Sequence, residues 1–367
     1  MITNTAIERD AERRDALVGR LFSAAIGTME LLCVYLGDRL GLYQALADRG
    51  STTAAELAAA TGTDERYVHE WLEQQAASGL LDVDDPRLDA ATRRYRLPAA
   101  YREVLLDADS LNCLSGLIRL VVGVGQPLPA LLEAFRSGGG VPYPAYGPDT
   151  REGIAAMNRP MFVNLLGTEW LPAVPDVHAR LQADPPARVA DVGCGAGWSS
   201  IALARAYPRA RVDGFDPDAA SIELARANAE AAGVADRVRF TACDAADPAL
   251  AGQYDLVTAF ETIHDMAQPV AVLANVRRLV AGGGTVIVAD ERVGETFSAP
   301  GDDVERLNYG FSVLHCLPVG LAETPSVGTG TVIRPDTLRR YATEAGFRAV
   351  EVLPIENDYW RFYRLFL

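Results

Sequence analysis

From about residue 181 to the C-terminus, short apolar stretches alternate with amphipathic segments of helical period. The stretches that predict strands are ARVADVG, ARVDGFD, DRVRFTACD, YDLVTAFE and GGTVIVADE, and helices are predicted to begin at Trp198, Ala219 and Pro269. Apolar strands separated by helices are typical of a parallel sheet covered on both faces. After the predicted helix PDTLRRYATEAGF, the tail adds RAVEVLPI and WRFYRLFL, which we expect to pair as a hairpin. The pattern predicts an α/β fold with seven strands.

The N-terminal hundred residues have a different texture, with short helices separated by glycines. Ser51-Thr52-Thr53 precedes AAELAAATG, and Thr63-Asp64 precedes ERYVHEWLEQQAASG, so both segments have helix N-caps. Two short strands, 80–83 and 94–97, follow and predict the wing of a winged helix. We therefore predict a winged-helix domain at 1–100, a helical connector and substrate cap at 101–180, and a catalytic domain at 181–367. The connector contains the loop SGGGVPYPAYGPD at 137–149.

The longest apolar run is LFSAAIGTMELLCVYL, residues 21–36. It is too short to span a bilayer comfortably and carries Glu30 in its middle, so we expect a buried helix, at a subunit interface of a homodimer. The N-terminal sequence MITNTAIERDAERRD is densely charged and lacks the apolar core of a secretory signal. We expect a cytoplasmic protein that does not contact a membrane.

Charge disfavours nucleic acid as a partner. The chain has 34 basic and 49 acidic side chains and a formal net charge of −15, which opposes binding to polyanions. The second helix of the winged helix carries four acids and one arginine between residues 64 and 78, a local charge of 1 − 4 = −3. A DNA-binding regulator that senses a ligand is therefore the less favoured alternative to an enzyme.

Cysteines and histidines indicate neither a disulfide framework nor a metal site. The five cysteines are far apart, with no CxxC pair, and the four histidines are equally scattered. We expect the protein to need no metal.

The strongest chemical signal is VADVGCGAG, residues 189–197, which places three glycines between a strand and a helix. Such a turn binds ligands through backbone amides. A dinucleotide loop needs a third glycine where this chain has Trp198, so a dinucleotide-dependent oxidoreductase is disfavoured. Asp191 beside the glycines would repel a diphosphate but suits a positive amino group. The loop therefore predicts a nucleoside that bears an amino acid.

Further acids end the following strands. Asp216 lies 23 residues after Gly193 (216 − 193), where an acid accepts hydrogen bonds from ribose hydroxyls. Asp244 ends the third strand and could accept a hydrogen bond from an adenine amino group. The fourth strand ends in FETIHD, residues 260–265. Because carboxyl ends of parallel strands share one edge, these groups are predicted to meet.

As a set, DVGCGAG, Asp216 and Asp244 resemble the class I S-adenosylmethionine-dependent methyltransferases. The whole chain is similar to small-molecule methyltransferases with an N-terminal winged helix, including plant-type O-methyltransferases. The resemblance implies a Rossmann-like seven-stranded methyltransferase sheet, S-adenosyl-L-methionine as cofactor and S-adenosyl-L-homocysteine as product. The cofactor-binding residues that it implies are Asp191, Gly193, Cys194, Gly195, Gly197, Asp216, Pro217, Cys243, Asp244, Ala245, Phe260 and Glu261.

In the plant-type enzymes a His-Asp pair after the fourth strand deprotonates the substrate hydroxyl, and IHDMAQP at 263–269 is similar. His264 is thereby implied as general base, with Asp265 supporting it, although Met266 stands where that family has a tryptophan. An N-, C- or carboxyl-directed acceptor would need no such base, and that alternative stays open.

The acceptor itself is not identified by a motif. Aromatic side chains indicate a small hydrophobic or aromatic metabolite, such as one of polyketide-like chemistry. The predicted lining of the substrate pocket is Tyr143, Tyr146, Phe162, Tyr309, Phe311 and His315.

Overall fold

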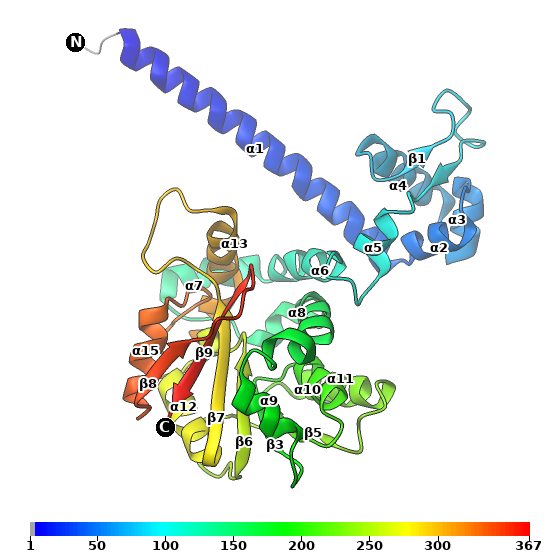
Figure 1. The fold of residues 1–367 in the computed structure, drawn as a ribbon. Coiled ribbons are helices and arrows are strands. Elements are labelled where there is room, and N and C mark those ends of the chain that lie inside the picture. Colours follow the sequence, from blue (N-terminus) through cyan, green and yellow to red (C-terminus); the bar gives the residue numbers. More distant parts are fainter. Residues whose placement is uncertain (1–3) are drawn as a thin grey trace. The chain divides into compact units, whose positions relative to one another are not determined.

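The computed structural model describes the backbone of residues 4–367 and the side chains of residues 8–367. Residues 1–3, the start of the predicted charged N-terminus, lie outside that range. The chain divides into two compact units, Met1–Val122 and Gly123–Leu367, coloured from blue to cyan and from green to red in Figure 1. The segment expected to be a connector, 101–180, is shared between the two units.

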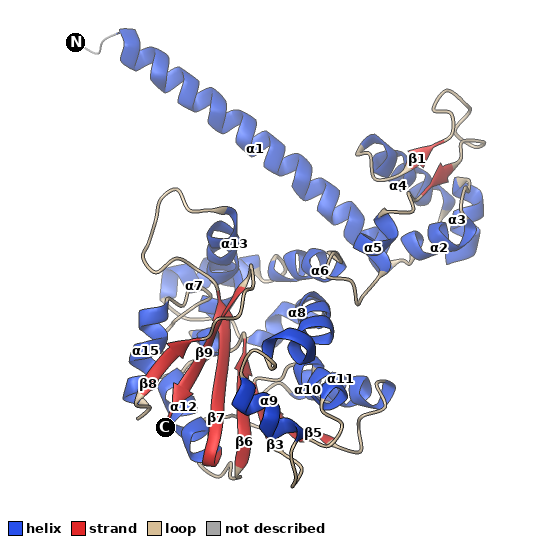
Figure 2. Ribbon diagram, in the orientation of Figure 1, coloured by secondary structure: helices blue, strands red, loops and turns tan. Residues whose placement is uncertain are grey.

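The first unit contains the predicted winged helix. Helices α3 and α4 form its helix-turn-helix, and β1 and β2 pair antiparallel as its wing (Figure 2). The elements are α1 (Asn4–Arg39), α2 (Leu42–Arg49), α3 (Ala54–Thr61), α4 (Glu65–Ala77), β1 (Asp82–Val83), β2 (Tyr95–Arg96), α5 (Tyr101–Leu106) and α6 (Ser115–Val124), whose last two residues belong to the second unit.

Local sequence signals explain where these helices begin. The Thr53 side chain accepts a hydrogen bond from the Glu56 amide and the Glu56 side chain accepts one from the Thr53 amide, which is the predicted capping box. Asp64 caps α4: its side chain accepts hydrogen bonds from the amides of Arg66 and Tyr67.

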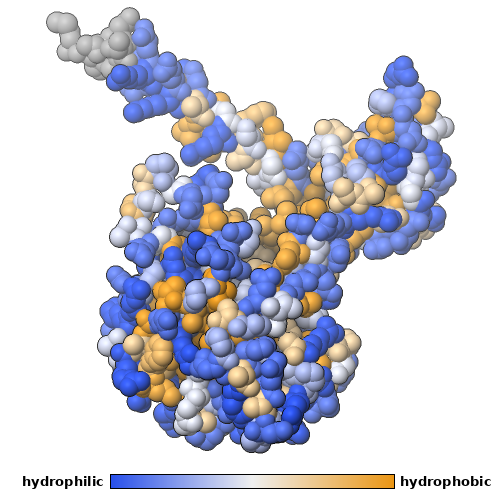
Figure 3. Space-filling model, viewed as in Figure 1, coloured by the Kyte–Doolittle hydropathy of each residue, from blue (hydrophilic) through white to orange (hydrophobic). Residues whose placement is uncertain are grey.

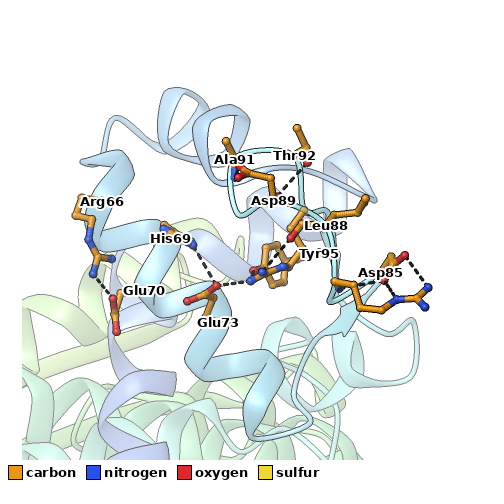
Figure 4. Close-up of polar contacts among 12 residues, drawn as sticks. Arg66, His69, Glu70, Glu73, Asp85, Leu88, Asp89, Ala91, Thr92 and Tyr95 are labelled. Atoms are coloured by element: carbon orange, nitrogen blue, oxygen red, sulfur yellow. Dashed lines mark hydrogen bonds and ion pairs between the residues drawn. The ribbon is translucent and has the colours of Figure 1, made fainter.

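The charged side chains of α4 are largely paired with one another (Figure 4). Arg66, the only arginine of the helix, forms an ion pair with Glu70. Glu73 contacts His69 at 3.2 Å and also binds Arg93 from the wing region. Little free positive charge is left on this helix for a phosphate backbone, which agrees with the charge count from the sequence.

Helix α1 corrects one expectation. The apolar run 21–36 belongs to a 36-residue helix. Most of its large apolar side chains are exposed, with Phe22 68% and Met29 63% exposed, and only its last turns, at Val34, reach the core. Figure 3 shows pale and orange atoms along the part of α1 that follows its charged first turns. By length and composition alone the helix could cross a membrane. Since a subunit interface produces the same pattern, the expected absence of a membrane contact stays a prediction.

The second unit contains the α/β fold. Its helical elements are α7 (Leu128–Ser137), η1 (Tyr143–Tyr146), α8 (Gly147–Met161), the π-helix η2 (Phe162–Trp170), α9 (Pro175–Gln182), α10 (Trp198–Ala206), α11 (Ala219–Ala231), η3 (Ile263–Asp265), α12 (Pro269–Leu279), α13 (Asp303–Phe311), η4 (Ser312–Cys316), α14 (Leu317–Gly320) and α15 (Pro335–Glu344). Its strands are β3 (Arg188–Val192), β4 (Arg211–Asp216), β5 (Val238–Ala242), β6 (Tyr254–Phe260), β7 (Val280–Glu291), β8 (Ala349–Val352) and β9 (Trp360–Phe366).

The seven strands form one sheet in the order β5-β4-β3-β6-β7-β9-β8. Strands β3 to β7 are parallel, whereas β9 pairs antiparallel with both β7 and β8. The predicted sheet and the C-terminal hairpin are confirmed. Strand β3 is central: β4 and β5 are added on one side of it, and β6 and β7 on the other. The strand order therefore reverses at β3, and the loops that follow β3 and β6 meet at a switch point.

Helices cover both faces of this sheet, and alternate residues of each strand point to opposite sides. Val189 and Val212 belong to the core that includes α9, α10, α11 and η2. Ala190 and Val257 belong to the core that includes α12 and α15. The central strands are therefore buried on both faces, which explains their unbroken apolar sequences.

Two glycines of α1 offer a direct test of the first unit's packing. A Cβ added to Gly37 would lie 2.4 Å from the Trp71 ring and 2.6 Å from the Tyr43 ring, whereas one added to Gly27 meets nothing within 4 Å. We expect Gly37→Ala to destabilise the first unit by about 1–3 kcal/mol through overpacking. The control Gly27→Ala should stabilise it slightly, because alanine is the better helix former. Scanning calorimetry compares the two; equal unfolding temperatures would contradict the packing described.

Candidate active site

The glycine loop between β3 and α10 has the conformation that its sequence requires. Gly193, Gly195 and Gly197 all have positive φ, at 71°, 49° and 81°. A Cβ on Gly193 would lie 2.1 Å from Oγ1 of Thr262, and one on Gly197 would lie 2.5 Å from the Phe240 ring, whereas Gly195 faces open space. A side chain at either of the outer two positions would therefore clash, so glycine is required there. At the middle position the loop backbone is accessible to a ligand.

Asp191 lies beneath this loop rather than in the cavity. Its carboxylate accepts hydrogen bonds from the hydroxyls of Ser199 at 2.5 Å, Ser200 at 2.7 Å and Thr258 at 2.8 Å. Burial raises the pKa of Asp191, and these three hydrogen bonds oppose that rise. Asp191 therefore joins β3, α10 and β6. Its predicted contact with the amino group of the cofactor stays a prediction.

Asp216 is positioned as predicted at the end of β4. Its two carboxylate oxygens accept hydrogen bonds from the amides of Gly195 and Asp218, both at 2.9 Å. Burial raises the pKa of Asp216 to about 6, against the effect of these two amides. The backbone carbonyl of Asp216 accepts a hydrogen bond from the Cys243 amide at 3.0 Å, so the ends of β4 and β5 adjoin.

The remaining predicted adenosine residues lie along the same edge. Pro217 follows Asp216 and is exposed, Asp244 is exposed with one oxygen bound to the Ala246 amide at 2.8 Å, and Ala245 is buried. The structure therefore brings the predicted ribose and adenine positions side by side at the carboxyl ends of β4 and β5.

A cavity opens beside the glycine loop. Five predicted cofactor residues (Gly193, Cys194, Gly195, Phe260, Glu261) and two predicted substrate residues (Tyr143, Phe162) line it. The other lining residues are Arg151, Ile154, Ala155, Asn158, Ala196, Trp198, Ser199 and Ser221. The backbone of the glycine loop and the side chain of Arg151 on one cavity fit the amino acid end of the predicted cofactor.

The tyrosine-containing segment is ordered around this cavity. The guanidinium of Arg151 lies 5.7 Å from the centre of the Tyr143 ring and binds Asp218 at 2.7 and 3.2 Å. His315 is buried edge-on to the rings of Tyr143 and Tyr146, at 5.8 and 4.7 Å between centres. Burial lowers the pKa of His315.

Four of the six predicted pocket residues do not line this cavity: Tyr146, Tyr309, Phe311 and His315. Tyr309 on α13 packs edge-on against Phe297 and accepts a hydrogen bond from Arg334 at 3.2 Å. Neither Tyr309 nor Phe311 lines the cavity. Their spacing on a helix alone did not establish which way they face.

His264 lies in η3 between two aspartates and is 2% exposed. Its Nδ1 is 2.5 Å from Asp290 and its Nε2 is 3.3 Å from Asp265. Burial would lower the pKa of His264, but the negative charges of Asp290 and then Asp265 outweigh it and raise that pKa well above its usual value. Burial would likewise raise the pKa of Asp265, yet His264 brings it to about 2. The site thus favours an imidazolium between two carboxylates.

Ligand atoms of His264, Asp265 and Cys316 lie within 4.8 Å of one another, close enough to surround a small cation. The charge of the imidazolium accounts for the proximity of the carboxylates without an ion. Whether the protein works without metal stays a prediction.

A second pair of acids adjoins this histidine. Glu261 and Glu291 share a hydrogen bond, and the side-chain amide of Asn158 also donates to Glu261. Burial raises the pKa of Glu261 to about 7, and burial together with repulsion from Glu261 raises the pKa of Glu291 well above its usual value.

Three of the site's polar residues were missed from the sequence. Asp290 and Glu291 end the fifth strand, so the strand-end argument that found Asp216 and Asp244 could have found them. Asn158 lies inside the amphipathic helix α8, where no motif distinguishes it. Tertiary structure alone brings it to Glu261.

Comparison with known proteins agrees with this geometry. Residues 183–317 match the family model described as a methyltransferase domain, and residues 27–106 match the Rv2258c-like winged HTH domain. The ubiquinone biosynthesis O-methyltransferase of Pseudomonas aeruginosa is 28% identical over 204 residues, which are 55% of this chain and 80% of that protein.

Two solved structures have a similar fold over nearly the whole chain. Human N-acetylserotonin methyltransferase, solved in complex with S-adenosylmethionine, has a TM-score of 0.70 at 18% identity and covers 95% of this chain and 97% of its own. Mitomycin 7-O-methyltransferase has a TM-score of 0.67 at 19% identity, and the match covers 97% of this chain and 99% of that protein's chain. The solved structures show the same fold, and the two domain matches and the curated relative, together with the glycine loop and Asp216, identify the chain as an S-adenosylmethionine-dependent methyltransferase with an N-terminal winged-helix domain.

Proposed function

We propose that the protein transfers a methyl group to a hydroxyl oxygen of a small hydrophobic or aromatic metabolite, with His264 as the proton acceptor. The observation that carries this proposal is the contact of 2.5 Å between Nδ1 of His264 and Asp290. His264 does not itself line the cavity but follows Phe260 and Glu261, which do. Several relatives are named as O-methyltransferases, among them the ubiquinone biosynthesis and mitomycin enzymes, which supports an oxygen acceptor.

The residues of the cavity supply alignment and exclude water. S-adenosylmethionine carries the transferable methyl group on a sulfonium, which reacts by in-line displacement. The backbone of the glycine loop and the Asp216 carboxylate lie where they can hold it, and Phe162, Phe260 and Trp198 give the cavity an apolar lining. For a displacement of this kind, alignment in a dry site provides much of the rate.

A hydroxyl acceptor must also lose its proton. Asp290 holds Nδ1 of His264, so Nε2 is the atom that can accept that proton, and Asp265 beside it stabilises the resulting imidazolium. Because the pKa of His264 is raised, its neutral form becomes populated only as the pH rises above neutrality.

Two alternatives follow from other features. An amine, carbon or carboxylate acceptor would need no base, and His264 would then only shape the site. A ligand-sensing DNA-binding regulator is disfavoured by the paired charges of α4.

We propose further that the protein is cytoplasmic and needs no metal. Turnover that survives dialysis against a chelator, with metal analysis of the dialysed protein, tests the last point.

Calorimetry with S-adenosylhomocysteine tests the cofactor site. Asp216→Ala should weaken binding by about 1–3 kcal/mol, because charge-assisted hydrogen bonds to the ligand are lost. Asp213→Ala is the matched control: Asp213 lies on the same strand but contacts Arg188 at 3.1 Å and Tyr254 at 3.0 Å. Equal S-adenosylhomocysteine affinities of the two variants would show that Asp216 does not contact the ligand.

Replacing His264 by glutamine tests the proposed base. With a phenolic acceptor identified by screening, His264→Gln should lower turnover by about 10²–10⁴-fold while S-adenosylhomocysteine affinity is unchanged. The wild-type rate should rise with pH above neutrality as His264 loses its proton, and the variant should lack that rise. A variant with wild-type turnover and the same pH profile would show that His264 only shapes the site.

We also propose a homodimer through the N-terminal unit, because α1 exposes Leu21, Phe22, Ile26 and Met29 to solvent. Light scattering should give twice the chain mass at micromolar concentration. Phe22→Glu should shift the protein toward the monomer, whereas a charge change at exposed Arg14 near the start of the helix should not. A monomeric wild type would contradict the proposal.

A further inference from the structure

A cluster of metal-ligating side chains surrounds the thiol of Cys316. One potential ligand atom from each of His264, Asp265 and Cys316 lies within 4.8 Å of the other two. None of these three residues lines the cavity beside the glycine loop. The cluster is therefore separate from the part of the site that fits the amino acid end of the cofactor.

The tertiary structure assembles this cluster from three segments of the chain. His264 and Asp265 lie in η3, and Cys316 is the last residue of η4. The third segment is tied to the first, because the amide of Gly330 donates a hydrogen bond to the carbonyl of His264 at 3.1 Å. Thr331 follows directly, and its side chain adjoins the Cys316 thiol.

Two buried oxygen atoms of the cluster lack a well-formed hydrogen bond. Oδ1 of Asp265 lies 3.3 Å from Nε2 of His264, but neither it nor Oγ1 of Thr331 has a hydrogen-bond partner of good geometry among residues 8–367. Thr331 is 2% exposed, so water does not reach its side chain freely. Buried polar atoms without partners are uncommon in native proteins, and a bound ion is one of the explanations for them.

The donor set indicates which ion the cluster would take. An imidazole nitrogen, a thiolate sulfur and a carboxylate oxygen suit Zn²⁺, whereas Mg²⁺ and Ca²⁺ prefer oxygen ligands. Asp290 lies 2.5 Å from Nδ1 of His264, and a carboxylate in this position orients an imidazole so that Nε2 can bind a metal. The ligand atoms would need to draw together slightly, because zinc binds nitrogen at about 2.0–2.1 Å and sulfur at about 2.3 Å.

We propose that His264, Asp265 and Cys316 form a zinc site, and that Zn²⁺ bound there inhibits methyl transfer. Zn²⁺ replaces one proton on Nε2 of His264 and one on the Cys316 thiol, and both protons leave to solvent. The net charge of the three ligands and the ion is zero before and after this exchange, so Asp290 meets no added charge. A fourth coordination position is left for water, and the Thr331 hydroxyl beside the thiol is available to that water.

The metal ion and the proton compete for a single nitrogen atom. Nε2 of His264 is the atom proposed to accept the proton of the acceptor, and bound Zn²⁺ removes it from that role. Zinc binding is independent of the proposed function, whereas inhibition rests on it. The zinc-free protein is the active form, so turnover itself needs no metal. An ion can enter at Asp265, whose side chain is 29% exposed, whereas that of His264 is 3% exposed.

Calorimetry with Zn²⁺ tests the site. The full chain is first dialysed against a chelator, and a competing chelator of known affinity keeps weak surface binding out of the signal. We expect one Zn²⁺ per chain. Cys316→Ser should weaken binding by about 100-fold or more, because loss of a partner outside the ligand set already costs about 10–100-fold. The matched control is Cys113→Ser, in the first unit, where Cys113 lies 3.2 Å from Ser115; its zinc affinity should equal that of the wild type.

Cobalt gives a readout that does not depend on activity. Co²⁺ should produce a thiolate-to-cobalt charge-transfer band in the wild type and in Cys113→Ser, and no such band in Cys316→Ser. S-adenosylhomocysteine binding and the unfolding temperature show whether each variant is folded, and Cys316→Ala takes the place of a serine variant that is not. A wild type without the band contradicts ligation by the thiol whatever the variants do.

Turnover of each protein is compared with its own zinc-free rate, with a hydroxyl acceptor identified by screening. Saturating Zn²⁺ should lower the wild-type rate by about 10²-fold or more, the value of a general base, and Mg²⁺ should not. Cys316→Ser should keep its rate at the same zinc concentration. Absence of tight zinc binding, equal zinc binding by Cys316→Ser, or equal inhibition by Mg²⁺ would overturn the zinc site. Zinc held through Cys316 with unchanged turnover would instead overturn the inhibition, and with it the role of His264 as base.

Discussion

The carboxyl ends of four adjacent strands each bring an acid to one edge of the sheet, and every acid there must be stabilised without bulk water. Asp191 uses three hydroxyls, Asp216 uses two backbone amides, and Asp290 uses the imidazole of His264. Glu261 and Glu291 have mainly each other. This accumulation of negative charge sets the pKa of His264 and makes the edge suited to cationic ligands such as a sulfonium.

The ways in which these acids are satisfied also hold the layers together. The hydroxyls on Asp191 come from α10 and β6, so one buried carboxylate joins β3 to the helix that follows the glycine loop and to a neighbouring strand. Asp216 holds the same loop from the other side through the Gly195 amide. The loop is thus preorganised by side chains that do not line the cavity, which lowers the entropy cost of ordering it around a ligand.

Predictions from strand ends were accurate because the sheet makes them geometrically necessary. Asp216 and Asp244 follow strands that pair in register, so their positions follow from the pattern. Predictions from side-chain type were weaker. The aromatic residues Tyr309 and Phe311 lie outside the cavity lining, and the apolar run in α1 is exposed, because apolar character does not specify which surface a residue packs against.

The sequence by itself determined the α/β class, the seven strands, the winged helix, the glycine loop and the acids at the ends of β4 and β5, since each depends on local periodicity or on spacing along the chain. Only the tertiary structure decided that Asp191 lies beneath the loop, that Asp290 holds His264, and that Asn158 meets Glu261 across 103 residues of chain. Those contacts depend on how α8, β6 and β7 pack against one another, and packing is a property of the whole unit that no local pattern encodes.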